Sequence, residues 1–533
     1  MPSSDGIRCS LQARSLALLS TAGISSSASD RKILFRMRTM QANNTDNGIQ
    51  GLKFLLILAC YFGLHILLRV TISDSLDYDE AEQALLGQWL LAGYTEQPPL
   101  YTWVQHYLFQ VFGENVFSVS LMKNLLLYLT YVFVFLSSRI ILKNTRAAIL
   151  ATCSLLLIPQ IAWESQRDMT HTTLVVLAAA ASLYQAVRLM NRQSCLNYLF
   201  WGLCIGVGFM AKANFSLFLL VLLLTLASLP EGRKIIFNWK LIFSVIVIFA
   251  LAGNYFYWML NNQDIVFSAT NKFKRAIDNY YVAGSLSMLR AIFLFLTPLW
   301  FFYLILFPSG YDAKWWEERT LQQKFIGRYI ALFCIVLLIF VLLFKVTYVK
   351  DRWLQPLLFA VPIFFFSRVP VEKITRGRAK AFLSVTVIAA MAVYIAFTLR
   401  VTAASYINEF CRMNYPFSAM AEDIRQNGFD SGLIISDNRF LAGNMHFQFP
   451  QSPALIPEYR FENLPATQGY DNGIVIWMAD KSPAIPENLS LFLSEKYAVN
   501  VKEHDIKYFE HRYKFGRTET VKLAVMPIPL SQP

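Results

Sequence analysis

Residues 52–82 read LKFLLILACYFGLHILLRVTISDSLDYDEAE, an almost wholly apolar run followed at once by a cluster of carboxylates. The apolar part, 52–72, is long enough to cross a bilayer as an α-helix. The acidic part, DYDEAE (77–82), begins where the chain leaves the membrane. Carboxylates are costly near hydrocarbon, so their presence there is typical of a functional site. The sequence therefore predicts a membrane protein whose function depends on this junction.

The composition of the whole chain indicates a polytopic membrane protein. Of its 533 residues, 55% are hydrophobic and only 16% are charged, and the mean hydropathy is +0.41. A soluble domain carries about 25% charged residues. Lipid permits only helices or closed barrels to cross it. We therefore expect a mostly α fold, a membrane helix bundle of the kind formed by consecutive apolar helices.

Eleven segments qualify as membrane-spanning helices, with boundaries good only to a few residues. The predicted spans are 52–72, 117–142, 147–163, 170–188, 196–210, 213–229, 241–261, 289–308, 326–345, 353–367 and 381–400. With the N-terminus inside the cell, every cytoplasmic connection between them is basic, as the positive-inside rule requires. The acidic junction 73–116, the loop 262–288 and the chain after about residue 401 then lie outside.

The net charge of +13 is explained mainly by these cytoplasmic connections. Their basic residues are Lys143, Arg146, Arg188, Arg192, Arg233, Lys234, Lys240, Lys314, Arg319, Lys324, Arg368, Lys373, Arg376, Arg378 and Lys380. No basic run is interleaved with aromatic residues, so nucleic-acid binding is not expected.

Both ends of the chain differ from the bundle, 51–400. Residues 1–50 are rich in Ser with scattered Arg, which suits either a transit peptide or an upstream extension with Met37 or Met40 as the start. We favour the extension and expect disorder in either case. Residues 401–533 alternate turn residues with short β-rich runs, and predict a small external α/β domain.

Asp79 and Glu80 open a stretch, 80–92, whose apolar residues have helical spacing. This pattern predicts an amphipathic helix lying along the membrane interface. Asp79 would stand at the start of that helix, where Asp is also a good N-cap, and the two roles are compatible. The prolines of EQPPLYTW (96–103) then force an extended entry into the next helix. FGEN (112–115) forms a turn before the second span.

The order of these motifs resembles that of the GT-C membrane glycosyltransferases that use polyprenyl-phosphate sugars. This group includes the protein O-mannosyltransferases, the aminoarabinose transferases and the rhizobial lipopolysaccharide-core galacturonosyltransferases, which look most similar. Three later segments match in the same order: WESQRD (163–168), GVGFMAK (206–212) and KDRWLQP (350–356). The resemblance covers about residues 51–400 well and the tail loosely.

The resemblance implies inverting transfer of a sugar from a polyprenyl phosphate to a hydroxyl group of a glycan or lipid acceptor. It further implies a bacterial inner-membrane protein whose active site and C-terminal domain face the periplasm. A carboxylate must accept the proton of the attacking hydroxyl. Fixed positive charge must stabilise the departing phosphate. Asp79 matches the position of the family's catalytic acid, and Glu80 is the alternative.

Further residues are expected to bind the substrates. Those that match the family's motifs are Glu96, Gln97, Tyr101, Asp168, Lys212, Lys350 and Arg352. Arg offers a phosphate a bidentate fork and Lys a point charge, although basic residues at span ends also snorkel to the interface. Asp168 would otherwise be a helix N-cap. The external loop adds Lys272, Lys274 and Arg275, which would meet an anionic headgroup or uronic acid, or form a solvated basic face.

Two departures from the aminoarabinose transferases bear on cofactors. Those enzymes have a Lys after the loop Glu, where this chain has Gln97. They also use a His of a later external loop as a metal ligand beside that Glu, and 262–288 contains no His. A divalent cation at Glu96 is therefore not supported, and no metal ligand is assigned.

A transporter or flippase of a lipid-linked substrate is the alternative from another functional class. Such proteins place ionisable residues near the bilayer midplane on broken helices. Here the notable charges gather at the outer ends of spans, which favours an external active site. A catalytically inactive acceptor-binding relative is the third possibility, and the presence of both Asp79 and Glu80 argues against it.

Overall fold

The computed structural model describes residues 28–267, 279–308, 320–459, 464, 467–480, 483–499 and 505–530, with side chains from residue 48 onward. The chain divides into two compact units, Met1–Ala59 and Cys60–Pro533. The first contains the beginning of helix α2 (Ala28–Ile72). The sequence predicted disorder throughout 1–50, whereas the chain is helical from Ala28; residues 1–27 lie outside the described part. All features discussed below belong to the second unit.

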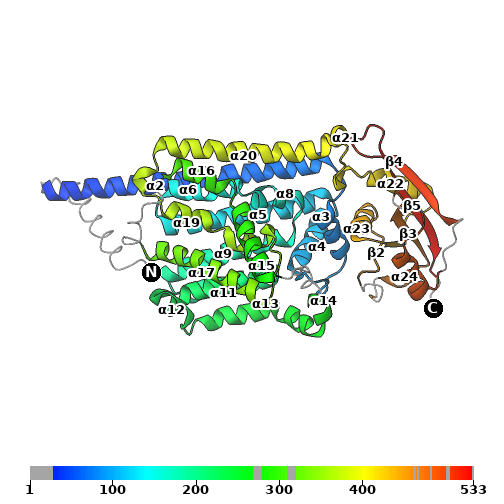
Figure 1. Ribbon diagram of the computed structural model, residues 1–533, viewed down its shortest axis with the longest axis horizontal. Coiled ribbons are helices and arrows are strands. Elements are labelled where there is room, and N and C mark those ends of the chain that lie inside the picture. The colour runs from blue at the N-terminus through cyan, green and yellow to red at the C-terminus, as the bar shows by residue number, and fades with distance from the viewer. Residues whose placement is uncertain are drawn as a thin grey trace, which may run out of the picture. The chain divides into compact units, whose positions relative to one another are not determined.

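The second unit is mostly helical up to residue 407, as the sequence predicted (Figure 1). After α2 its helices are α3 (Tyr78–Leu86), α4 (Leu100–Phe112), α5 (Val116–Leu142), α6 (Thr145–Cys153), α7 (Pro159–Ala162), α8 (Glu164–Asp168), α9 (His171–Asn191), α10 (Cys195–Phe209), α11 (Phe215–Ala227), α12 (Pro230–Ile236), α13 (Leu241–Asn261), α14 (Gln263–Phe267), α15 (Tyr280–Phe295), α16 (Leu299–Leu306), α17 (Leu321–Leu343), α18 (Gln355–Leu358), α19 (Val361–Ser367), α20 (Arg376–Thr402) and α21 (Ala404–Ile407).

Among the described residues, six helices are long and apolar enough to cross a membrane, or up to eight if each of two bent pairs is one span. The predicted spans 196–210 and 213–229 correspond to α10 and α11, which are apolar but shorter. The predicted span 353–367 is a 3₁₀ turn followed by two short helices, α18 and α19. Each of these helices has a proline as its second residue, Pro356 and Pro362, and proline lacks the backbone N–H needed to continue a preceding helix.

The C-terminal sheet region, from α22 (Phe417–Gln426) to the last strand, is a mixed α/β structure, in agreement with the sequence-based prediction. Its elements are α22, β1 (Leu433–Ser436), α23 (Arg439–Gln448), β2 (Ala454–Leu455), β3 (Asn472–Met478), α24 (Glu487–Tyr497), β4 (Lys507–Arg512) and β5 (Thr520–Pro529). The strand order is β2-β1-β3-β5-β4. β1 is parallel to β2 and β3, whereas β5 is antiparallel to β3 and β4.

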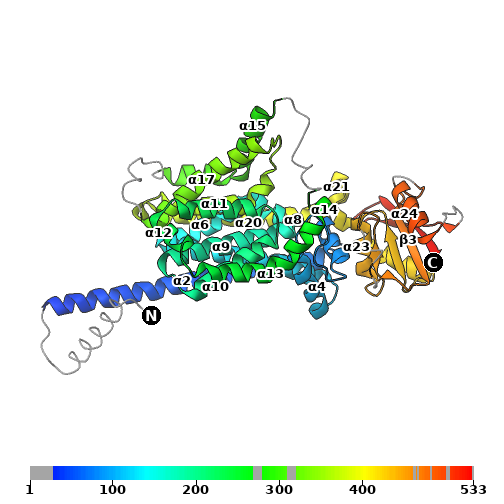
Figure 2. The same ribbon diagram turned by 90° about the horizontal axis from the view of Figure 1, so that it is seen from below.

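Helix α3 packs against α23, at the end of the bundle that the sheet region covers (Figures 1 and 2). The two backbones approach so closely that a Cβ on Gly443 of α23 would lie 1.9 Å from the carbonyl oxygen of Ala81. Ala81, Ala84 and Leu85 belong to the same buried apolar cluster as the strands. Helix α3 is therefore part of the core of the C-terminal sheet region.

This packing corrects the prediction of an interfacial helix over 80–92. Helix α3 ends at Leu86, with Gly87 as its C-cap, and most of its side chains are buried. Trp89 and Leu91, which were expected to continue the helix, pack instead against the apolar cluster of the sheet region. Apolar spacing alone does not distinguish a membrane surface from a protein surface as the partner, and here the partner is protein.

Candidate active site

The N-terminus of α3 is held by a capping box that involves Asp77 and Glu80. The Asp77 carboxylate accepts a hydrogen bond from the backbone N–H of Tyr78 at 2.8 Å. The Glu80 carboxylate accepts one from the backbone N–H of Asp77 at 3.1 Å. The helix N-cap is therefore Asp77 and not Asp79, which leaves the Asp79 side chain free of a capping role.

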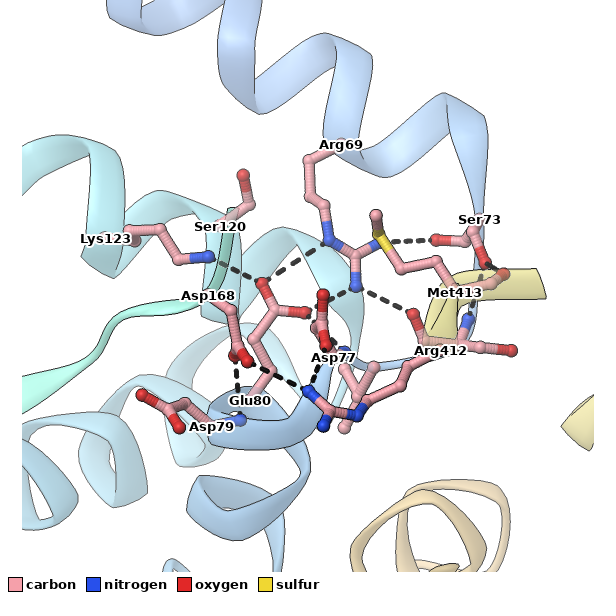
Figure 3. A network of polar contacts seen from close by, with 12 residues as sticks. Arg69, Ser73, Asp77, Asp79, Glu80, Ser120, Lys123, Asp168, Arg412 and Met413 are labelled. Carbon is pink, nitrogen blue, oxygen red and sulfur yellow. Dashed lines mark hydrogen bonds and ion pairs between the residues drawn. The ribbon is translucent and has the colours of Figure 1, made fainter. Parts of the chain in front are cut away.

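Glu80 is buried between two cations that come from membrane-spanning helices (Figure 3). Arg69 of α2 pairs with it at 2.6 Å and Lys123 of α5 at 2.8 Å. Burial on its own raises the pKa of Glu80, but Arg69 and Lys123 outweigh it and hold this pKa well below its usual range. Both carboxylate oxygens are thus committed to ion pairs, so the geometry favours Glu80 as an anchor for α3 rather than as a base.

Asp77 and Asp168 share a third cation, Arg412. Its Nη1 lies 3.2 Å from Asp77 Oδ1 and 3.3 Å from Asp168 Oδ2. Arg400, in the last turn of α20, contacts the other Asp77 oxygen at 3.0 Å. Asp168, at the end of α8, also accepts a hydrogen bond from the backbone N–H of Asp79 at 2.9 Å. The predicted site residues Asp79 and Asp168 are therefore in contact, through the backbone N–H of Asp79.

The Asp79 carboxylate points away from this network (Figure 3). Among the described residues, no side chain forms an ion pair with it. Burial, with the nearby Glu82 carboxylate, raises the pKa of Asp79 to about 6, while Lys212 and Lys123 act in the opposite direction. A partly buried carboxylate with a pKa near the working pH, and with oxygens not used for structure, is suited to general-base chemistry.

Lys212 lies close enough to Asp79 to lower its pKa, and its Nζ donates a hydrogen bond to Thr172 at 2.8 Å. The structure thus brings this predicted cation to the predicted base. Glu96 is half-buried. It lies near the start of α9, because its charge acts on His171 there. Tyr101 is fully buried, with its ring centroid 5.4 Å from that of His171. Its burial favours a supporting role behind α3 over direct contact with a substrate.

Two further predicted cations, Lys350 and Arg352, lie on a segment separate from Asp79. Lys350 lies over the Trp353 ring, 5.7 Å from its centroid, and the Arg352 side chain is exposed. Their segment is joined to the chain before Asp168, because Gln355 donates a hydrogen bond to the Gln160 carbonyl at 2.7 Å. No contact in the described part of the chain joins Asp79 to either cation.

Four predicted residues remain, namely Gln97 and the three cations of the loop 262–288. Gln97 is half-buried, and its backbone N–H donates to the Thr95 hydroxyl at 3.2 Å. Lys272, Lys274 and Arg275 lie outside the described residues.

Four cations of this site were not singled out from the sequence: Arg69, Lys123, Arg400 and Arg412. Three of them carried a signal, because Arg69, Lys123 and Arg400 are charged residues within long apolar helices. Ionisable residues inside membrane spans are costly and usually have a partner. Arg412 lies in a polar segment with no motif, and nothing in the sequence distinguishes it from other surface arginines.

Within the described residues, no group of three or more His, Cys, Asp or Glu side chains is arranged to hold a metal ion. The sequence-based expectation that a divalent cation at Glu96 is not supported stays a prediction.

Comparison with known proteins gives consistent matches. A family model described as dolichyl-phosphate-mannose-protein mannosyltransferase matches residues 96–258. The lipopolysaccharide core galacturonosyltransferase RgtB of Rhizobium johnstonii is 31% identical over 481 residues, which is 86% of this chain and 96% of that protein. RgtA of the same organism, with the same description, is 28% identical over 475 residues, covering 87% and 94%.

Among solved structures, ArnT from Cupriavidus metallidurans bound to undecaprenyl phosphate superposes with a TM-score of 0.55. The match covers 89% of this chain and 98% of ArnT at 14% identity, so it shows the fold alone. The fold is thus the GT-C fold that the motif order predicted. Together with the near full-length match to RgtB, this makes the protein an integral membrane glycosyltransferase and excludes the transporter alternative. The chain belongs to the family of GT-C membrane glycosyltransferases that includes the lipopolysaccharide core galacturonosyltransferases.

Proposed function

We propose that this protein transfers galacturonic acid from a polyprenyl-phosphate carrier to a hydroxyl group of the lipopolysaccharide core. The observation that carries the proposal is the match over nearly the whole chain to two lipopolysaccharide core galacturonosyltransferases. A polyprenyl carrier is supported by the undecaprenyl phosphate bound to ArnT, which has the same fold. The sugar and the acceptor are the parts of this proposal that an experiment must establish.

Asp79 is the proposed general base. In the transfer step the acceptor oxygen forms a bond to the anomeric carbon while the bond from that carbon to the carrier phosphate breaks. The proton of the acceptor hydroxyl passes to the Asp79 carboxylate, and the bonding electron pair leaves with the phosphate. Attack opposite the leaving group inverts the anomeric centre. The Asp79 carboxylate, which forms no ion pair with any residue that the structure describes, supports this role.

Positive charge is needed where the phosphate departs. Lys212 is the proposed first contact, because its charge already acts on Asp79. Lys350 and Arg352, on the segment joined to Gln160, are proposed to complete the phosphate site once the carrier is bound. Catalytic contacts are often looser in a free enzyme than in its substrate complex. Asp168 is proposed to position Asp79 through its backbone N–H.

Analysis of the products in a deletion strain tests the function. Mass spectrometry is expected to show lipopolysaccharide that lacks one galacturonic acid residue, while polyprenyl-phosphate galacturonic acid is retained. Purified protein in detergent is expected to transfer the sugar from that donor to the mutant lipopolysaccharide. Because detergent removes the bilayer that separates donor from acceptor, a flippase would not be required in this assay. Unchanged lipopolysaccharide in the deletion strain, or no transfer by the purified protein, would contradict the proposal.

The active site is proposed to face the periplasm across the bacterial inner membrane. The basic residues of the predicted cytoplasmic connections support this orientation. An alkaline phosphatase fused near residue 420 is expected to be active, since that enzyme works only outside the cytoplasm. A fusion near residue 192, between α9 and α10, is the matched control and should be inactive. The reverse pattern would contradict the orientation.

A further inference from the structure

Arg412 reaches the active site from a distant part of the chain. It opens the short 3₁₀ helix η7 (Arg412–Asn414), between α21 and the C-terminal sheet region. Its guanidinium bridges Asp77 and Asp168, and lies 4.6 Å from the centroid of the Tyr78 ring. Figure 3 shows Arg412 meeting Asp77 and Asp168 close to the backbone nitrogen of Asp79. One ion pair and one hydrogen bond, both through Asp168, thus link Arg412 to the Asp79 backbone.

The backbone around Arg412 is fixed by several hydrogen bonds. On one side, Ser73 Oγ donates to the Met413 carbonyl and Ser75 Oγ to the Tyr415 carbonyl, each at 2.6 Å. On the other, the buried Asn414 amide donates to the Val401 carbonyl at 2.9 Å. Segments from before α3 and from the end of α20 therefore hold η7 in place. A side chain supported in this way is preorganised, which is what precise positioning of a reacting group requires.

The charges around Asp79 make a cation at this position important. The charged groups that face Asp79 are Asp77 and Glu82 on its own segment, Asp168 of α8, Lys123 of α5 and Lys212 after α10. Without Arg412, Asp168 would have no ion pair among the described residues and Asp77 would keep the one with Arg400, while Arg167 and Lys123 would act on Asp168 through space. Carboxylates so close together retain protons to higher pH unless a cation offsets their repulsion.

We propose that Arg412 is a positioning residue for sugar transfer. It fixes Asp168, and through Asp168 the backbone of the base Asp79, while its charge offsets part of the repulsion between Asp77 and Asp168. This inference rests on the proposed function in taking Asp79 as the base. It makes the segment after the last membrane helix a part of the active site rather than an appendage.

The test compares three variants of the full-length protein in detergent: Arg412→Gln, Arg412→Lys and Arg425→Gln. Arg425 is the matched control, because it lies on the sheet region with a similar exposure, 39% against 45% for Arg412, and contacts Glu422, a backbone carbonyl and the Phe449 ring, which lie outside the site. Initial rates are measured against pH and donor concentration. The donor is polyprenyl-phosphate galacturonic acid, and the acceptor is lipopolysaccharide from the deletion strain.

For Arg412→Gln we expect kcat to fall about 10- to 100-fold, because a displaced base loses its alignment, with little change in the KM for the donor. The acid limb of its pH–rate profile is expected to move up by about one pH unit. Arg412→Lys keeps the charge, so the acid limb should return towards that of the wild type. Arg425→Gln should match the wild type in all three quantities.

Two results would overturn this inference. One is wild-type kcat in Arg412→Gln. The other is a lower kcat whose acid limb is unmoved and whose melting temperature has fallen, since that pattern belongs to a structural role alone. Failure of the wild-type protein to use this donor is a different result, because it would contradict the proposed function before any variant is compared.

Discussion

The Asp79→Asn variant is expected to lose sugar transfer by about 100- to 10,000-fold, the usual contribution of a general base. Asparagine preserves the size of the side chain and the hydrogen bond from the backbone N–H of residue 79 to Asp168. Its amide, however, cannot take the proton of the acceptor hydroxyl. Expression and the melting temperature should stay close to wild type, since no described ion pair is removed. Transfer is measured with the purified protein, and melting by the release of buried thiols or tryptophan fluorescence.

Asp430→Asn is the matched control, because Asp430 is an exposed aspartate of the sheet region that is not one of the residues forming the site. It is expected to be fully active. Near-normal transfer by Asp79→Asn would contradict the assignment of the base.

The wild-type protein should show the protonation of this base in its pH dependence. Asp79 must be ionised to accept a proton, and burial raises its pKa to about 6. The rate is therefore expected to be high above pH 7 and to fall as the pH is lowered through about 6. An acid limb that lies near pH 4, the ordinary range of an exposed aspartate, would show that the site does not desolvate this group.

The Glu80→Gln variant is expected to fold poorly, with the free energy of unfolding lowered by about 3–5 kcal/mol. Glutamine leaves Arg69 and Lys123 buried without their common anion, and an unpaired buried charge is the most costly outcome of breaking such a pair. The expected observations are a low yield of folded protein in the membrane and a lower melting temperature. Any loss of activity should follow the loss of folded protein.

Glu422→Gln is the control for this change. Glu422 forms an exposed ion pair with Arg425 at 3.6 Å, and such surface pairs contribute little to stability. It should melt as the wild type does. A Glu80→Gln variant that is stable yet inactive would instead favour Glu80 as a catalytic group.

Much of the fold followed from local sequence. Long apolar runs predicted α5, α9, α13, α17 and α20, because a segment of about 20 apolar residues can bury its backbone in lipid only as a helix. Short β-rich runs at 432–436 and 473–477 predicted strands, and β1 and β3 lie there. The interfacial helix over 80–92 was wrong, because its apolar residues pack against protein from a distant part of the chain.

The sequence by itself determined that carboxylates stand where the first membrane helix ends, and that a GT-C glycosyltransferase was to be expected. It did not determine which carboxylate is available for chemistry. Asp77, Glu80 and Glu82 are each neutralised by cations that packing brings to them, such as Arg400 from 323 positions away and Arg439 from 357. Asp79 is left without such a partner among the described residues. Only the tertiary structure decides which carboxylate is left without a partner, because ion pairing depends on which side chains meet in space. The residues adjacent to a carboxylate in the sequence do not predict its partner.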